Sequence, residues 1–212
     1  NISGTAANVT YNTTRGNNLS TIVSGALTIT GTSTSDINFT MKSAGANLNP
    51  AAIGTSTISL PGTVTLDNTY GCTGTGCTPA TGFITAANLA TYATTGAGVT
   101  INNVIYSNKA ISVKGIANGS QGVVISAIVK ANTGNINLYG IGVAHRGVEY
   151  SADITAVDGN VVMTGITNTN YGIYTSNASL IQANNITLNG SASGAVGGWI
   201  VQTGALKINS TA

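Results

Sequence analysis

The sequence contains little charge, few aromatic residues and only two cysteines, and each shortage excludes something. Asp, Glu, Lys and Arg make up only 6% of the 212 residues, and the net charge is +2. Nucleic-acid binding needs clustered cations, and no basic cluster is present, so we expect no nucleic-acid partner. No apolar run approaches the length that spans a bilayer, so we expect no membrane insertion. Aromatic residues are 5%, too few for a core built on large rings.

The two cysteines, Cys72 and Cys77, lie close together in a glycine-rich segment. Their spacing is wider than that of a CxxC redox motif, and the ligands that would complete a zinc site are absent. We therefore predict a disulfide clip on an exposed loop, with two free thiols as the alternative. Such a clip contributes about 2 kcal/mol in the entropic model and indicates an oxidising compartment.

From residue 109 onward the sequence repeats with a 25-residue period, which is the step from Gly115 to Gly140. A fixed period of this length is typical of a solenoid, in which one repeat buries its apolar face only by stacking on copies of itself. We interpret the glycines as corner residues that adopt a positive φ. Glycines form two columns, Gly115, Gly140, Gly165 and Gly190, and Gly122, Gly147, Gly172 and Gly197.

Three short runs in each repeat alternate apolar and polar residues, as strands with one buried face do. The chain is therefore expected to be all-β, a right-handed parallel β-helix with three sides and 25-residue coils. We expect Ile116, Ile141 and Ile166 to be additional inward residues after a corner. The inward pairs of the first run are Ile111/Val113, Ile136/Leu138, Val161/Met163 and Ile186/Leu188. The inward pairs of the second run are Val123/Ile125, Val148/Tyr150, Ile173/Thr175 and Gly198/Ile200. The inward pairs of the third run are Val104/Tyr106, Val129/Ala131 and Ile154/Ala156, and this run continues near Leu180/Ile181.

A column of asparagines, Asn135, Asn160 and Asn185, falls at one corner of the predicted coil. Side-chain amides at equivalent positions of stacked coils can form a ladder, each bonding to the next. The alternative is that asparagine simply suits the backbone of a corner.

We expect one β-helix domain over residues 1–212, with irregular coils over 1–66 and regular repeats over 97–212. The disulfide loop would span residues 67–82. Residues 83–96 break the β pattern and predict a short helix, with Thr85 as N-cap and Gly96 at the end. Leu89, Tyr92 and Ala93 would share one face of that helix.

The segment Ile84-Thr-Ala-Ala-Asn-Leu, followed by Val99-Thr-Ile, resembles phrases of filamentous-haemagglutinin-like exoproteins of Gram-negative bacteria. The Gly-Asn-Ile-x-Leu-x-Gly pattern at residues 134–140 is similar to the β-helix repeats of that family. The family's N-terminal secretion motif is not present here. The resemblance implies a secreted, surface-exposed adhesin stalk. A structural role in display is therefore the first expectation, on the outer surface of a bacterial cell.

An outward column of Val124, Glu149, Tyr174 and Trp199 offers the second function. Exposed aromatic residues often mark contacts, so Tyr174, Trp199 and Glu149 are candidate contacts to a glycan or a protein receptor. The alternative is that the two rings stack only on each other or lie under a neighbouring segment.

A polysaccharide-degrading enzyme is the third alternative, because some parallel β-helices carry that activity. Glycoside hydrolysis normally needs two carboxylates in one cleft. The acidic residues are scattered, and His145, the single histidine, fits a solvated corner better than a catalytic base. We expect no enzymatic activity, no cofactor and no metal. The five acidic residues are Asp36, Asp67, Glu149, Asp153 and Asp158.

Neither end of the chain carries a recognisable cap. Ala205-Leu-Lys-Ile-Asn-Ser is another alternating strand, and we see no cap before Asn8-Val-Thr-Tyr. Uncapped parallel coils template further association. We expect end-to-end stacking, either on neighbouring β-helix segments of a longer chain or on copies of the same chain.

Overall fold

The structure is a computed structural model. It describes residues 2–3, 8–13, 29–30, 38–43, 58–60, 64–67, 96–102, 104–175, 177–193, 200–202 and 206–210. Its side chains are described at Leu66 and between residues 96 and 193. The described residues do not include Cys72, Cys77 or the helix expected before Gly96. Of the predicted disulfide loop they include only its first residue, Asp67, which ends a strand.

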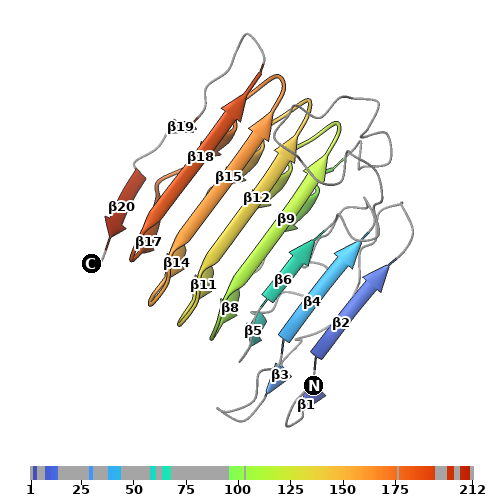
Figure 1. Cartoon of the computed structure of the whole chain (residues 1–212), viewed down its shortest axis with the longest axis vertical. Coiled ribbons are helices and arrows are strands. Elements are labelled where there is room, and N and C mark those ends of the chain that lie inside the picture. Colours follow the sequence, from blue (N-terminus) through green and yellow to red (C-terminus); the bar gives the residue numbers. More distant parts are fainter. Residues whose placement is uncertain are drawn as a thin grey trace.

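All strand pairs are parallel, and three sheets wind around one axis as a β-solenoid of about four turns (Figure 1). The prediction of a three-sided parallel solenoid is therefore confirmed. The first sheet contains β2 (Asn8–Thr13), β4 (Asn38–Ser43), β6 (Val64–Asp67), β9 (Ile111–Ala117), β12 (Ile136–Gly142), β15 (Val161–Thr167) and β18 (Ile186–Ala192). The second contains β7 (Val99–Ile101), β10 (Val123–Ile125), β13 (Val148–Tyr150), β16 (Ile173–Thr175) and β19 (Ile200–Gln202). The third contains β5 (Ile58–Leu60), β8 (Ile105–Ser107), β11 (Val129–Ala131), β14 (Ile154–Ala156), β17 (Ser179–Ala183) and β20 (Leu206–Ser210).

The core is the column of inward side chains that the alternation predicts. Ile111, Ile136 and Val161 are fully buried and pair in register one coil apart, whereas Asn137 on the opposite face is exposed. The second sheet places Ile125, Tyr150 and Thr175 on one inward column. The large Tyr150 ring therefore lies between smaller side chains, which is how a narrow interior accommodates an aromatic residue at high packing density.

The third run is shifted by one residue in its first coil. Ile105 and Ser107 are buried, whereas Tyr106 is 38% exposed, so the predicted inward pair Val104/Tyr106 is wrong. The reason is that Ile105 pairs with Val129, a step one residue shorter than the repeat period. A shift of one residue exchanges the two faces of a strand.

The last coils are longer than the sequence period. Ile154 pairs with Ile181 and Ile173 pairs with Ile200, and each step is two residues longer than the period. Ile200 therefore occupies the position opposite Ile173 that the strict period assigns to Gly198, and that predicted match is wrong. The extra residues lie in the corner between β16 and β17, and Asp153, directly before β14, binds the strand that follows this corner, because its Oδ1 accepts a hydrogen bond from the Leu180 amide at 2.8 Å.

Ile116, Ile141 and Ile166 do not extend the central core. Alternation along β9 places Ile116 on the face opposite Ile111, and the three isoleucines form a second cluster with Val143. The prediction that they point into the interior is wrong because the strand continues past the glycine column without a corner. Ile116 and Ile141 are buried nonetheless, at 0% and 2% exposure.

The glycine columns have a different cause from the one predicted. No left-handed φ occurs at Gly115, Gly140 or Gly165. Instead, a Cβ at Gly140 would overlap the carbonyl oxygen of Gly147, and Gly165 faces Gly172 in the same way. Glycine is required here because two backbone segments approach too closely for any side chain.

The asparagine ladder is confirmed for one of its two steps at the corner before the first sheet, and the other step joins a side chain to a backbone amide. Asn185 Nδ2 donates to Asn160 Oδ1 at 3.0 Å, and Asn135 Oδ1 accepts from the Asn160 backbone amide at 2.9 Å. A second contact of this kind, which the sequence analysis did not predict, joins Asn132 Nδ2 to Asn108 Oδ1 at 2.8 Å.

In the sequence, Ala26-Leu-Thr-Ile-Thr-Gly and Ala205-Leu-Lys-Ile-Asn-Ser both match the alternating motif of the repeats, but the strands described in them lie outside the first sheet. Ile29 and Thr30 form β3, which pairs only with β1 (Ile2–Ser3) among the described strands. Leu206–Ser210 forms β20 on the third sheet, beside β17. The alternating pattern therefore predicts a strand in both places but does not determine which sheet it joins.

Candidate functional site

Polar and aromatic side chains gather on the outer face of the second sheet. Its strands place one outward residue in each coil, and the register aligns Thr100, Val124, Glu149 and Tyr174. The next position in this column is Val201, not the predicted Trp199, because the last coil is two residues longer than the period. Trp199 itself lies outside the described residues.

A second column runs beside the first, three residues earlier in each coil. It consists of Gln121, Arg146 and Tyr171, each directly before a glycine of the second glycine column. Their outward side chains meet the outward column at the corner where the second sheet begins. We call the six residues at this corner the outer cluster. They are Ser120, Gln121, Arg146, Glu149, Tyr171 and Tyr174.

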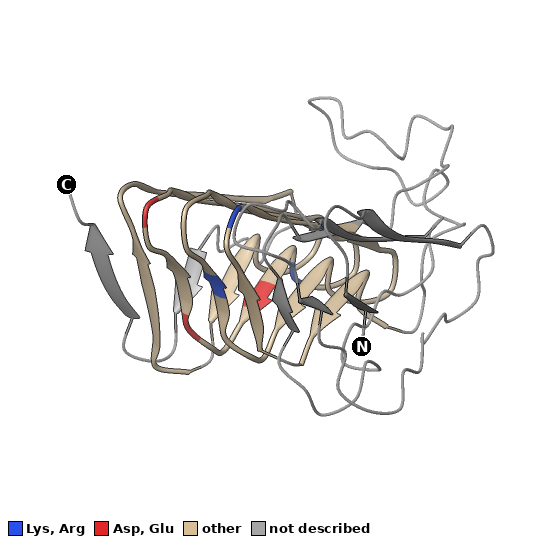
Figure 2. Ribbon diagram, turned by 90° about the horizontal axis from the view of Figure 1, so that it is seen from below, with Lys and Arg blue, Asp and Glu red and all other residues tan. Residues whose placement is uncertain are grey.

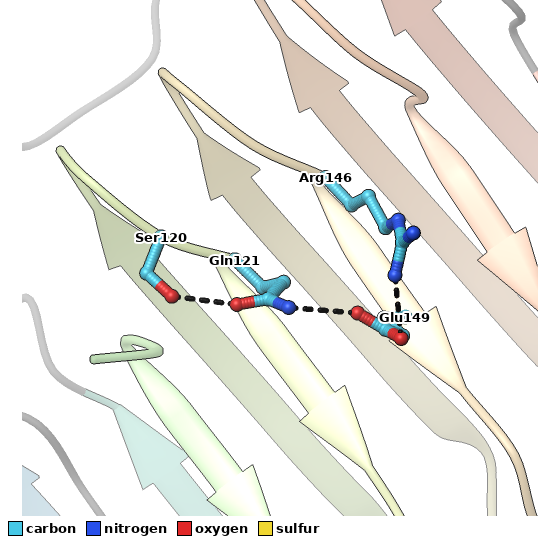
Figure 3. Close-up of polar contacts among 4 residues, drawn as sticks. All are labelled: Ser120, Gln121, Arg146 and Glu149. Carbon is cyan, nitrogen blue, oxygen red and sulfur yellow. Dashed lines mark hydrogen bonds and ion pairs between the residues drawn. The ribbon is translucent and has the colours of Figure 1, made fainter. Parts of the chain in front are cut away.

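Glu149 is the centre of the polar half of the outer cluster (Figure 3). Its Oε1 lies 2.6 Å from Arg146 Nη1, and its Oε2 accepts a hydrogen bond from Gln121 Nε2 at 2.8 Å. The Ser120 hydroxyl donates to Gln121 Oε1 at 2.5 Å, which fixes the orientation of the amide. Figure 3 shows these contacts crossing from the β10 coil to the β13 coil.

Arg146 joins the polar half to the aromatic half. Its guanidinium carbon lies 3.6 Å from the centroid of the Tyr174 ring, a cation–π contact between adjacent coils. Tyr171 and Tyr174 stack with centroids 5.5 Å apart and ring planes 14° apart. Because the side chains of Arg146 and Glu149 are only 21% and 18% exposed, their ion pair is screened less than one at the surface.

The carboxylates of the described side chains contact structural partners or solvent. Glu149 is neutralised by Arg146, and Asp153 binds a backbone amide. Asp158 is exposed in a corner. Figure 2 shows how sparse the charged residues are along the coils. Among the described residues no group of three His, Cys, Asp or Glu side chains could hold a metal ion.

His145 lies in a corner as predicted, but it is less solvated than the sequence indicates. Its backbone oxygen accepts a hydrogen bond from the Thr167 hydroxyl, and its ring Nδ1 is buried. Arg146 Nε is also buried, and neither nitrogen has a hydrogen-bond partner among the described residues. The corner therefore packs closely around both side chains.

The structure brings two of the predicted contact residues, Glu149 and Tyr174, into one cluster. Arg146, Tyr171 and Gln121 were missed, although a signal for them exists in the sequence. They recur at the repeat period three residues before the outward column. That spacing is informative only once the strand boundaries are known.

Comparison of the chain with protein-family models, with curated proteins and with solved structures finds no match. The class therefore follows from the fold alone: the chain is a parallel β-solenoid repeat protein. The residues that the structure describes contain no helix long and apolar enough to cross a membrane.

Proposed function

We propose that this chain is a structural stalk or display segment of a secreted bacterial cell-surface adhesin or extracellular filament. The observation that carries the proposal is the unbroken register of the first sheet, in which each residue from Ile111 to Gly115 pairs with its equivalent in the three following coils. Each coil adds about 4.8 Å to such a stack. The number of coils thus sets the length of a rod, and a rod of set length suits a stalk that extends away from the cell surface.

The side-chain composition supports a mechanical role. The buried columns of all three sheets consist largely of aliphatic side chains, and asparagine contacts join neighbouring coils at two corners. Backbone hydrogen bonds between coils run along the rod axis, so extension of the rod loads many bonds at once. The resemblance of residues 83–102 and of the repeats to filamentous-haemagglutinin-like exoproteins supports the cell-surface assignment.

We further propose that the solenoid stacks end to end on neighbouring solenoid coils or on copies of itself. Ile186 and Leu188 in β18 are only partly buried, whereas their equivalents Val161 and Met163 one coil earlier are fully buried. The apolar interior therefore extends to the outer side of β18, where another coil would cover it.

Immunogold electron microscopy of intact cells that encode the chain tests the location. The expected result is label outside the outer membrane, at a distance from it. Label that appears only after the cells are permeabilised would contradict the proposal.

A pair of deletions tests the role in reach. Removing residues 136–160 joins Asn135 to Val161 and keeps every sheet in register, so the protein should fold, and labels attached on either side of the deletion should lie about 4.8 Å closer together. Removing residues 136–147 deletes about half a coil, destroys the register and should prevent folding. If the two deletions behave alike, the rod does not set the reach.

A further inference from the structure

We propose that residues 83–95 of this chain dock on an apolar patch on the outer face of the first sheet. We call it the flank patch. It consists of Ile116, Tyr139, Ile141, Val143 and Ile166. Docking there holds the segment with Cys72 and Cys77, which directly precedes residues 83–95, to the side of the rod. The proposal goes beyond the stalk function and does not depend on it.

The flank patch points away from the central core. Alternation along β9 places Ile111 in the core and Ile116 on the opposite face. Ile141 on β12 and Ile166 on β15 pair in register with Ile116 and continue the same column. The column therefore crosses three coils on the face of the sheet that a solenoid normally turns to solvent.

The flank patch is nevertheless covered at its β9 end. Ile116 and Ile141 are only 0% and 2% exposed, whereas Ile166 is partly exposed and the next position in the column is the exposed Ser191. Neighbouring strands alone do not bury such side chains, because the outward Val162 also remains partly exposed between its neighbours. A further segment must lie over Ile116 and Ile141. Since both are buried within a single chain, that segment belongs to this chain.

Residues 68–95 leave and rejoin the described part of the chain beside Ile116. Asp67, the last residue of β6, pairs with Lys114, two positions before Ile116. Where the chain resumes, a Cβ at Gly98 would overlap the backbone nitrogen of Ile116. β6 lies next to β9 on the side away from β12 (Figure 1). A segment that arrives from that side buries Ile116 and Ile141 more than Ile166, which is the observed order.

Within this segment, residues 83–95 have the composition that an apolar patch requires. The stretch contains Phe83, Ile84, Leu89 and Tyr92 and no charged residue, whereas residues 68–82 are mainly glycine, threonine and cysteine. Burial of apolar side chains is favourable, and a stretch without charge loses no ionic hydration when it is buried. Leu89 and Tyr92, which the sequence places on one face of a helix, are the side chains that we expect to meet the isoleucines.

Limited proteolysis of the whole chain with chymotrypsin, with fragments identified by mass spectrometry, tests the docking. Chymotrypsin cleaves after aromatic residues and leucine, so Phe83, Leu89 and Tyr92 report release of the segment. Ile141→Ala removes a buried contact and should speed cleavage at these residues roughly tenfold or more, because cleavage follows the population of the open form. Val162→Ala is the matched control. It shortens an outward aliphatic side chain of the same sheet outside the flank patch and should leave the rate unchanged.

Cleavage after Tyr106, which lies in a strand of the third sheet, reports unfolding of the rod itself and should stay slow in both variants. If Ile141→Ala fails to fold, Ile141→Val replaces it and should speed cleavage by roughly threefold.

Three outcomes would overturn the proposal. The first is an equal cleavage rate after residues 83–95 in the Ile141 variants and the unaltered chain. The second is cleavage there in the unaltered chain as fast as in denaturant. The third is cleavage after Leu19 or Leu48 in place of residues 83–95, which would assign the cover to the segment after β2 or after β4. None of them bears on the location and reach of the stalk, which are measured on cells.

Discussion

The carbonyl oxygen of Gly147 occupies the space into which a side chain at Gly140 would project. The same relationship joins Gly115 to Gly122 in the coil before and Gly165 to Gly172 in the coil after. The two glycine columns of the sequence therefore face each other at the corner between the first and second sheets. They allow the first and second sheets to converge where one ends and the other begins.

Gly140→Ala should lower the free energy of unfolding by about 1–3 kcal/mol, because the added methyl forces backbone segments apart. Asn137→Ala on the same strand is the control, since Asn137 is exposed and its loss should change stability by no more than about 0.5 kcal/mol. Urea unfolding measures both. Equal stability of Gly140→Ala and the unaltered chain would show that the glycine columns are not needed for packing.

The register of the first sheet predicts opposite effects for two adjacent residues. Ile136 is fully buried and Asn137 is exposed. Ile136→Asp places an unpaired charge in the core and should destabilise the fold by more than about 3 kcal/mol. Asn137→Asp should leave the thermal unfolding midpoint almost unchanged. A midpoint that does not move in Ile136→Asp would refute the assigned register.

The asparagine ladder should contribute measurably to stability. Asn160→Ala removes the acceptor for the Asn185 amide, which should cost about 0.5–1.5 kcal/mol. The exposed Asn102 serves as a comparison, and Asn102→Ala should have no such effect. Denaturant titration of the two variants distinguishes a ladder from a mere preference of asparagine for corners, because only the ladder predicts a difference.

Stability should fall at high pH. Desolvation by burial raises the pKa of Tyr150 from 10.0 to about 12, so the folded state holds this proton more tightly than the unfolded chain does. The resulting stability is fully present below about pH 10 and is lost as the pH rises towards about 12. Tyr150→Phe should reduce the loss of unfolding free energy between about pH 10 and about pH 12 by about 1–3 kcal/mol.

Denaturant unfolding at a series of pH values, with tyrosinate absorbance recorded in parallel, measures this dependence. Tyr139, whose pKa burial also raises to about 12, contributes to the same fall and remains in Tyr150→Phe. Tyr106→Phe is the control, because this ring is exposed. An identical pH dependence in Tyr150→Phe and the unaltered chain would contradict the assignment.

Cys72 and Cys77 should be bonded to each other. Digestion without reducing agent, followed by mass spectrometry, should recover the two cysteines in one linked peptide. Recovery of both as alkylated thiols from the native protein would rule out the clip and weaken the argument for an oxidising compartment.

Much of the fold is predictable from the sequence because it is a local property repeated at a fixed distance. Alternation in Ile111–Val113 and its copies identifies the buried face of each strand, and the 25-residue spacing aligns those strands without knowledge of any contact. The asparagine ladder follows from the same spacing. A repeat predicts its own neighbours, because the residue that stacks on a given position is its equivalent in the next copy.

The candidate site was predictable only in part. Glu149 and Tyr174 follow from the outward alternation of the second sheet, but Trp199 was placed beside them by a period that the last coil does not keep. Arg146 and Tyr171 reach the site from a corner, where no alternation indicates the direction of a side chain. Their contacts depend on rotamers and on the distance between two columns.

The sequence by itself determined the solenoid, its coil length and most of its buried residues, because hydrophobic alternation and repeat spacing are carried by neighbouring residues. The tertiary structure alone decided which face Ile116 occupies, where shorter and longer coils shift the register, and that Arg146 bridges Glu149 to Tyr174. Those outcomes depend on how one coil lies on the next. Corner length fixes that placement, and it has no signature within a single repeat.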